Sequence, residues 1–188
     1  MAADRYRGAL EQAGDRIVAG RAMDGDVEAF AVLVRRYTPM MRAYSHRMLN
    51  ASSEVDDVVQ EAFVTAWQRF GELDDPTKVK SWLMRIVSRK AVDRIRRARP
   101  SVDVTEIDRP APLHTSPSAV VEVREGVAAL GAALRELPEA QRECWVLREM
   151  AGYSYDEIAA ELGIPTSTVR GLLSRARSSL ITRMEGWR

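Results

Sequence analysis

The sequence has almost none of the residues that build disulfides or metal sites. Its single cysteine, Cys144, excludes an internal disulfide, and its two histidines, His46 and His114, lie too far apart to form a ligand cluster. No apolar run approaches the length of a membrane span. The N-terminus mixes charged residues with apolar ones, unlike a signal peptide. We therefore expect a cytoplasmic protein without membrane insertion, metal or cofactor.

The sequence also has almost no net charge. Its 28 basic and 27 acidic residues leave a formal charge of +1, so nucleic-acid binding cannot be argued from the total. The charges are instead segregated along the chain. Residues 52–61 hold four acids and no base, and residues 85–99 hold seven bases against Asp93 alone. Such runs are usually solvated helix faces, but here they give one domain two different charged surfaces.

No segment alternates between apolar and polar residues as a strand does, so the sequence predicts an all-α fold. In the first half we expect one helix after the cap residue Asp26 and another that begins at Ser52 or Ser53 and closes at Gly71. A third should begin after Pro76. The second of these helices has the cleanest apolar side, made of Val55, Val58, Val59, Ala62, Phe63, Ala66, Trp67 and Phe70.

A proline-rich segment divides the chain. Four prolines fall within residues 99–117, where they prevent a continuous helix and predict an extended linker. We expect two small helical domains on either side of it, residues 24–98 and residues 118–188. A lead segment of residues 1–23 precedes them.

A short helix, a tight turn and a basic helix follow one another near the C-terminus. Ser154 and Glu157 form a capping box at the start of the short helix, and Gly163 is placed to end it in a left-handed turn. The basic helix has an apolar stripe of Val169, Leu172, Leu173, Ala176 and Leu180. Its opposite side carries Ser167, Arg170, Ser174, Arg177 and Ser178. The pattern is typical of a helix-turn-helix that enters the major groove, although an ordinary hairpin with a solvated basic face would share it.

A series of short motifs adds a family resemblance. In the first half they are Asp56–Trp67, Ser81–Val87 and Asp93–Arg97. In the second half they are Leu137–Arg142, Gly152–Ala159 and Thr168–Arg177. In this order, with the linker between the two groups, the chain resembles RNA polymerase sigma factors of the extracytoplasmic-function (ECF) branch. The first group is similar to the second domain of that family, and the second group to its fourth domain.

The resemblance implies a subunit that binds core RNA polymerase, directs it to promoters and nucleates strand opening. The residues that match the family's polymerase-binding helix are Asp56, Asp57, Gln60 and Glu61. Those that match the loop and helix at the downstream (−10) promoter element are Lys78, Lys80, Arg85, Arg89, Lys90, Arg94, Arg96 and Arg97. Those that match the helix at the upstream (−35) element are Ser167, Arg170, Ser174 and Arg177. The sequence departs from the family pattern at two places: many relatives have Asn at the position of Arg89, and many have a polar pair in place of Gly171-Leu172.

The alternative is a stand-alone helix-turn-helix regulator, which would have no use for the acidic face of residues 56–61. An enzyme such as a nuclease ranks third, because the sequence shows no nucleophile motif, no phosphate-binding glycine loop and no carboxylates at metal-binding spacing. We accordingly expect no small-molecule substrate. The chain ends soon after the second domain, which leaves no room for a further regulatory domain, so we expect inhibition by a separate anti-sigma protein.

Overall fold

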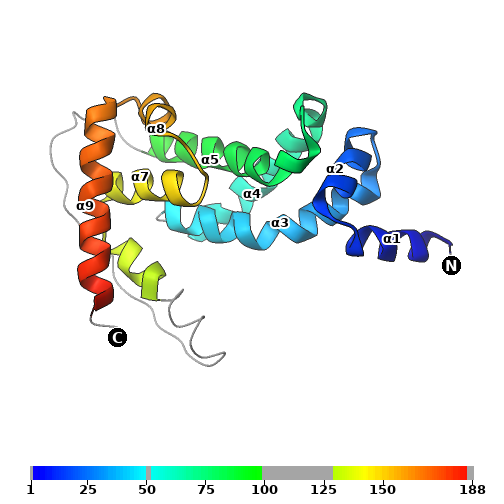
Figure 1. The fold of residues 1–188 in the computed structure, drawn as a ribbon, viewed down its shortest axis with the longest axis horizontal. Coiled ribbons are helices and arrows are strands. Elements are labelled where there is room, and N and C mark those ends of the chain that lie inside the picture. Colours follow the sequence, from blue (N-terminus) through cyan, green and yellow to red (C-terminus); the bar gives the residue numbers. More distant parts are fainter. Residues whose placement is uncertain (1, 50–51, 99–128, 186–188) are drawn as a thin grey trace. The chain divides into compact units, whose positions relative to one another are not determined.

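Helices make up all the regular structure in the computed structural model, which describes residues 2–49, 52–98 and 129–185 (Figure 1). No strand occurs in these ranges, and the all-α prediction is confirmed. The chain divides into two units, residues 1–97 and residues 98–188. The predicted linker, residues 99–117, lies outside the described residues. In the described ranges no helix has the length and apolar character needed to cross a membrane.

The first unit is a set of α-helices joined by short turns. They are α1 (Ala2–Gln12), α2 (Asp15–Met23), α3 (Val27–Met48), α4 (Val55–Gln68) and α5 (Val79–Ala98), with 3₁₀ turns at Ser52–Glu54, Phe70–Glu72 and Pro76–Lys78. The cap of α3 is the predicted one, because the Asp26 carboxylate accepts hydrogen bonds from the backbone N–H groups of Glu28 and Ala29 at 3.0 and 3.1 Å.

Helix α4 packs one side against α3 and differs from the prediction at both ends. Neither Ser52 nor Ser53 caps it. Its N-cap is Glu54, whose side chain makes no capping bond and instead pairs with Arg94 of α5. The helix stops at Gln68 rather than at Gly71, because the buried Phe70 turns the chain inward in a 3₁₀ turn.

Aromatic rings connect the elements of the first unit. Phe30 of α3 meets the ring of Phe63 of α4 edge-on at 6.4 Å and that of Phe70 at 5.5 Å. Phe70 in turn packs edge-on against Trp82 of α5 at 5.3 Å. Trp67, which we expected inside, is 41% exposed and covers Phe30 from outside, with ring centres 4.9 Å apart. Edge-on pairs of this kind stabilise a core beyond the area they bury.

The predicted lead segment of residues 1–23 is folded onto the first unit. Helix α2 buries Val18, Ala19 and Ala22. At its first residue, the Asp15 carboxylate accepts hydrogen bonds from the Tyr37 hydroxyl and the Arg36 guanidinium of α3. A folding fragment should therefore begin before α2, because a cut at residue 24 removes both the apolar contacts and these polar ones.

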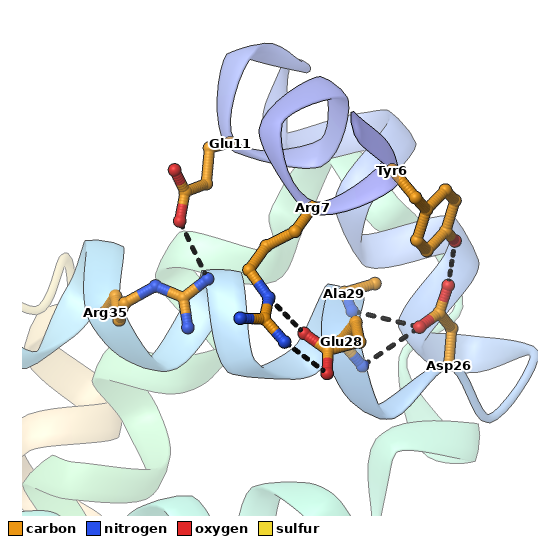
Figure 2. A network of polar contacts seen from close by, with 7 residues as sticks. All are labelled: Tyr6, Arg7, Glu11, Asp26, Glu28, Ala29 and Arg35. Atoms are coloured by element: carbon orange, nitrogen blue, oxygen red, sulfur yellow. Dashed lines mark hydrogen bonds and ion pairs between the residues drawn. The ribbon is translucent and has the colours of Figure 1, made fainter. Parts of the chain in front are cut away.

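Helix α1 is attached to α3 mainly by polar side chains (Figure 2). Leu10 of α1 is buried, but the other contacts that Figure 2 shows between α1 and α3 are ion pairs and hydrogen bonds. Arg7 makes a forked pair with Glu28 at 3.0 and 3.1 Å. The Glu11 carboxylate accepts a hydrogen bond from Arg35 at 3.0 Å. Exposed pairs of this kind contribute up to about 1 kcal/mol each and are weakened by salt.

The second unit is a small bundle built around one long helix. A helical segment at residues 129–135 is followed by α7 (Glu139–Glu149), α8 (Tyr155–Leu162) and α9 (Thr166–Glu185). Helices α7 and α8 both pack against α9 (Figure 1). One cluster of the core consists of Ala133, Leu134, Leu137, Ala176 and Leu180, with Leu130 and Trp145 against it. Cys144 of α7 is fully buried, and burial raises the pKa of its thiol to about 12.

The Asp15 contacts lead to a prediction about stability. We expect Asp15→Asn to lower the free energy of unfolding by about 1 kcal/mol at neutral pH, because the amide replaces a charged acceptor of two hydrogen bonds. Chemical denaturation of both proteins measures the difference.

The same variant should lose its effect in acid. Burial acts to raise the Asp15 pKa, but the hydrogen bonds from Tyr37 and Arg36 and the Arg36 charge outweigh it and hold the pKa below the ordinary value of 3.8. The stabilisation is therefore complete above the unfolded pKa and disappears as the pH falls through the lowered folded pKa. Repeating the denaturation near pH 3 should show a smaller difference between the two proteins, and an unchanged difference would rule out an ionic origin.

Candidate protein- and DNA-binding surfaces

The burial of one side of α4 places its polar residues together on the other side. Asp56, Asp57, Gln60 and Glu61 are all exposed and form what we call the acidic face. Arg42 of α3 pairs with Asp56 at 3.2 Å. The structure thus brings together the four residues that the resemblance assigns to one partner.

An apolar groove of about 510 Å³ runs beside the acidic face, between α3 and α4. Its apolar lining consists of Phe30, Val34, Val59, Phe63, Val64 and Trp67, and Asp56 and Gln60 lie on its border. Val64 and Trp67 are 51% and 41% exposed. Exposed apolar surface with a polar rim is typical of a protein-binding site. We did not predict this groove from the sequence, although Val64 lies off the apolar stripe of α4 and was the available signal.

The basic residues of α5 divide into two rows. Arg85, Arg89 and Arg96 follow one exposed side of the helix and form the outer row. Lys90, Arg94 and Arg97 follow each other at helical spacing on another side and form the inner row. The inner row lies toward α4, because Lys90 lines a polar groove together with Asp57, Gln60 and Glu61. The two predicted surfaces therefore adjoin each other along this groove.

Arg94 joins the acidic and basic surfaces directly. One of its terminal nitrogens lies 3.3 Å from a carboxylate oxygen of Glu54, and the other lies 2.9 Å from one of Glu61. The Arg94 side chain is only 21% exposed. A residue predicted to bind DNA is thus paired with a residue predicted to bind protein.

The segment before α5 is shaped by an aspartate cap. The Asp75 carboxylate accepts hydrogen bonds from the backbone N–H and the hydroxyl of Thr77 at 2.9 and 2.7 Å. The hydrogen bond from the Thr77 hydroxyl lowers the pKa of Asp75 most, and the bond from the backbone N–H lowers it further. Lys78 lies 3.8 Å from Asp75, and both Lys78 and Lys80 are exposed. One cation in the turn and one in the first turn of α5 are therefore presented at the beginning of this helix.

The helix-turn-helix of the second unit has the predicted local geometry. The Ser154 hydroxyl accepts a hydrogen bond from the Glu157 N–H at 3.2 Å, and the Glu157 carboxylate accepts one from the Ser154 N–H at 2.8 Å. Gly163 ends α8 in the left-handed region, at φ 69°. The Thr166 hydroxyl donates to Asp156 at 2.9 Å and so ties the start of α9 to the start of α8. The capping box and the glycine turn are both confirmed.

Helix α9 presents its predicted polar side to solvent. Ser167, Arg170, Ser174 and Arg177 are exposed, and Val169, Leu173, Ala176 and Leu180 are buried opposite them. Leu172 lies between the two sides and is half-buried. Arg177 pairs with Glu149 of α7 at 3.0 Å, so it helps to fasten α9 to the bundle.

One motif residue, Arg142, has a structural role. It is buried in α7, and its guanidinium donates a hydrogen bond of 3.5 Å to the backbone carbonyl of Arg135, which ends the preceding helical segment. Burial lowers the pKa of its guanidinium.

Among the described residues, His, Cys, Asp and Glu side chains form no group of three or more that could hold a metal ion.

Comparison with known proteins gives matches in both units. The family model Sigma-70 region 2 matches residues 33–100, and Sigma-70, region 4 matches residues 128–180. The chain is 33% identical over 175 residues to the RNA polymerase sigma factor CnrH of Cupriavidus metallidurans, which covers 88% of this chain and 92% of that protein. It is 33% identical over 187 residues to the ECF RNA polymerase sigma-E factor of Escherichia coli, covering 93% and 96%. The solved structure of CnrH in complex with the cytosolic domain of CnrY matches with a TM-score of 0.51 and 31% identity, covering 92% and 97%.

Gly171 in α9 yields a prediction about helix stability. A Cβ atom added there would meet the flexible Arg175 guanidinium at 3.5 Å, an ordinary contact. We expect Gly171→Ala to stabilise the protein by about 0.5–1 kcal/mol, because alanine loses less backbone freedom in a helix. Thermal unfolding followed by circular dichroism measures the change. Gly163→Ala is the matched comparison and should destabilise, because its φ of 69° strains any residue with a Cβ.

Proposed function

This chain belongs to the sigma-70 family of RNA polymerase sigma factors, in the ECF branch, and from that premise we propose which of its surfaces bind polymerase and promoter DNA. A sigma factor binds core RNA polymerase, directs it to promoters and nucleates strand opening. Matches to family models in both units favour this function over a stand-alone regulator.

We propose that the acidic face and the apolar groove together form the polymerase-binding site. The observation that carries this proposal is the exposure of Val64 and Trp67 directly beside the carboxylates of α4. Burial of an exposed indole and an aliphatic side chain supplies affinity, and tryptophan is common among residues that dominate binding. Carboxylates at the border of the groove would orient a basic partner and speed its association.

The outer row of α5 is the proposed contact to the phosphates of the downstream promoter element. Arg85, Arg89 and Arg96 extend over about 16 Å of helix. Two further cations precede them, Lys78 in the 3₁₀ turn and Lys80 at the start of α5. Guanidinium groups suit phosphate recognition because they donate two parallel hydrogen bonds. Such contacts fix the register of the DNA and carry little sequence information.

In the second unit, α9 is the proposed reader of the upstream promoter element. Ser167 and Arg170 lie in its first two turns, where a recognition helix meets base edges, and Ser174 follows on the same side. Arg177 lies further from the N-terminus of the helix, a position that suits a phosphate contact better than a base contact.

The same premise extends to regulation and location. The relative CnrH has been solved in complex with the cytosolic domain of CnrY, and another matched structure is that of the sigma factor RpoE in complex with the anti-sigma factor NepR from Bartonella quintana. We infer that this chain is likewise inhibited by an anti-sigma protein and that it acts in the cytoplasm with the polymerase. None of these roles needs a catalytic group, a cofactor or a small-molecule substrate.

Charge reversal on the acidic face tests the polymerase site. Asp57 is exposed, so Asp57→Arg should leave the fold intact while weakening binding to core polymerase by about tenfold, equal to ~1.4 kcal/mol. Competition binding with purified core enzyme measures it. Asp24→Arg, at an exposed position at the end of α2, is the matched control and should bind normally. Equal affinities for all three proteins would reject the assignment.

Run-off transcription on a panel of altered upstream elements separates the two DNA contacts. If the Arg170 side chain reads a base, Arg170→Ala should weaken the apparent affinity for the preferred element by about 1–3 kcal/mol and so reduce transcription from it. Transcription from the altered elements should change little. The pair Arg85→Ala with Arg96→Ala should weaken all promoters similarly and flatten the salt dependence. A uniform loss with Arg170→Ala would limit that residue to the phosphate backbone.

A further inference from the structure

Two carboxylates from two different segments hold Arg94 of α5. Glu54 belongs to the 3₁₀ turn before α4 and Glu61 to α4 itself, and Arg94 contacts them at 3.3 and 2.9 Å. One guanidinium between two carboxylates leaves the cluster with a net charge of −1. Asp57 and Lys90 line the adjoining polar groove and add one charge of each sign.

This arrangement makes Arg94 a poor phosphate ligand in the free protein. A phosphate that approaches its guanidinium also approaches Glu54 and Glu61, and the repulsion between like charges opposes the contact. The contact between Arg94 and Glu61 also opposes polymerase binding in part, because Glu61 of the acidic face already has a cationic partner. In the free protein, Glu61 thus occupies the guanidinium that would bind a DNA phosphate, and Arg94 occupies the carboxylate that would bind the polymerase.

We propose that Arg94 couples the two binding events by changing partners. When a basic group of the polymerase takes Glu61, the Arg94 guanidinium becomes available to a DNA phosphate; when a phosphate takes Arg94, Glu61 becomes available to the polymerase. The proposal rests on the proposed function, since it assumes that polymerase binds the acidic face. Because coupling between two sites is reciprocal, each partner then favours the binding of the other by the same factor.

The DNA half of the exchange can be tested on the free protein. Phosphate contacts do not depend on sequence, so the probe is a mixed-sequence fluorescent duplex oligonucleotide followed by anisotropy. Replacing both carboxylates, Glu54→Gln with Glu61→Gln, should release Arg94 and raise affinity roughly threefold at low salt, with a log–log salt slope steeper by about 0.9. Arg94→Gln in the otherwise unchanged protein should lower the affinity only slightly, because the paired guanidinium makes little contact with phosphate. Added to the double variant, it should cancel the gain, whereas Arg94→Lys should keep it because a lysine still supplies a charge to phosphate.

A matched control separates this exchange from a general effect of removing acids. Glu11→Gln with Glu28→Gln also removes two carboxylates of the first unit that are paired with arginines, Arg35 and Arg7. Because Arg7 and Arg35 belong to α1 and α3 rather than to the basic helix α5, this control should raise the affinity for the oligonucleotide and the salt slope clearly less than the first double variant does. An equal gain in the control, or a gain in the first double variant that survives Arg94→Gln, would overturn the proposal.

The polymerase half is tested by binding to purified core enzyme. Arg94→Gln should tighten binding by up to about fivefold, the upper value for an ion pair at a protein surface, because Glu61 no longer has to leave a partner. The gain should vanish when Glu61→Gln is already present. A residue that only held α5 against α4 would instead weaken core binding when replaced.

The same measurements distinguish this inference from its premise. If the unchanged protein fails to bind core enzyme, or binds it independently of the acidic face as judged by Asp57→Arg, the proposed function is wrong. If it binds through the acidic face but Arg94→Gln has the same effect with and without Glu61, only the partner exchange is wrong.

Discussion

A helix in a small domain can bury only one side, and in α4 the choice of side determines the surface of the first unit. Val58, Ala62 and Phe63 fix the rotation of the helix by packing inward. Because successive residues are 100° apart, that rotation turns Asp57 and Glu61 outward. The acidic face is thus a direct result of core packing, and a change in the apolar stripe would move the carboxylates with it.

Paired polar groups add to apolar packing in the placement of several helices. Asp15 accepts hydrogen bonds from two side chains of α3, and Arg94 bridges α5 to both α4 and the turn before it. In the second unit, Arg177 ties α9 to α7 through Glu149. A charged pair contributes little free energy at the surface, but its geometry is directional and so defines which residues face each other. The surfaces proposed to bind polymerase and DNA are held in register in this way.

Local rules explain what the sequence could predict. The capping box at Ser154 and the turn at Gly163 depend on neighbours within a few residues, and both were predictable. The exposure of the acidic face followed from helical periodicity alone. The pair between Arg94 and Glu61 joins residues 33 positions apart, and no periodic pattern reports such a contact. The roles of the individual site residues came from the family resemblance and were not derivable from spacing.

The predictions that were wrong also depended on contacts between residues far apart in the sequence. Trp67 lies at the edge of the apolar stripe, and whether such a residue is buried depends on a neighbouring helix reaching it. The first 23 residues showed no motif, yet α2 contributes Val18, Ala19 and Ala22 to the core. The serines at positions 52 and 53 satisfied the rule for a helix cap, but the 3₁₀ turn placed Glu54 at that position instead. In each case tertiary packing decided between options that local preference allowed.

The burial of Cys144 has a consequence for how this protein can receive a signal. Reactive thiols must be exposed and deprotonated, whereas this one lies fully inside the second unit with its pKa raised to about 12. Since it is the single cysteine of the chain, an oxidant has no accessible thiolate here to modify. While the second unit stays folded, thiol chemistry therefore does not act directly on Cys144.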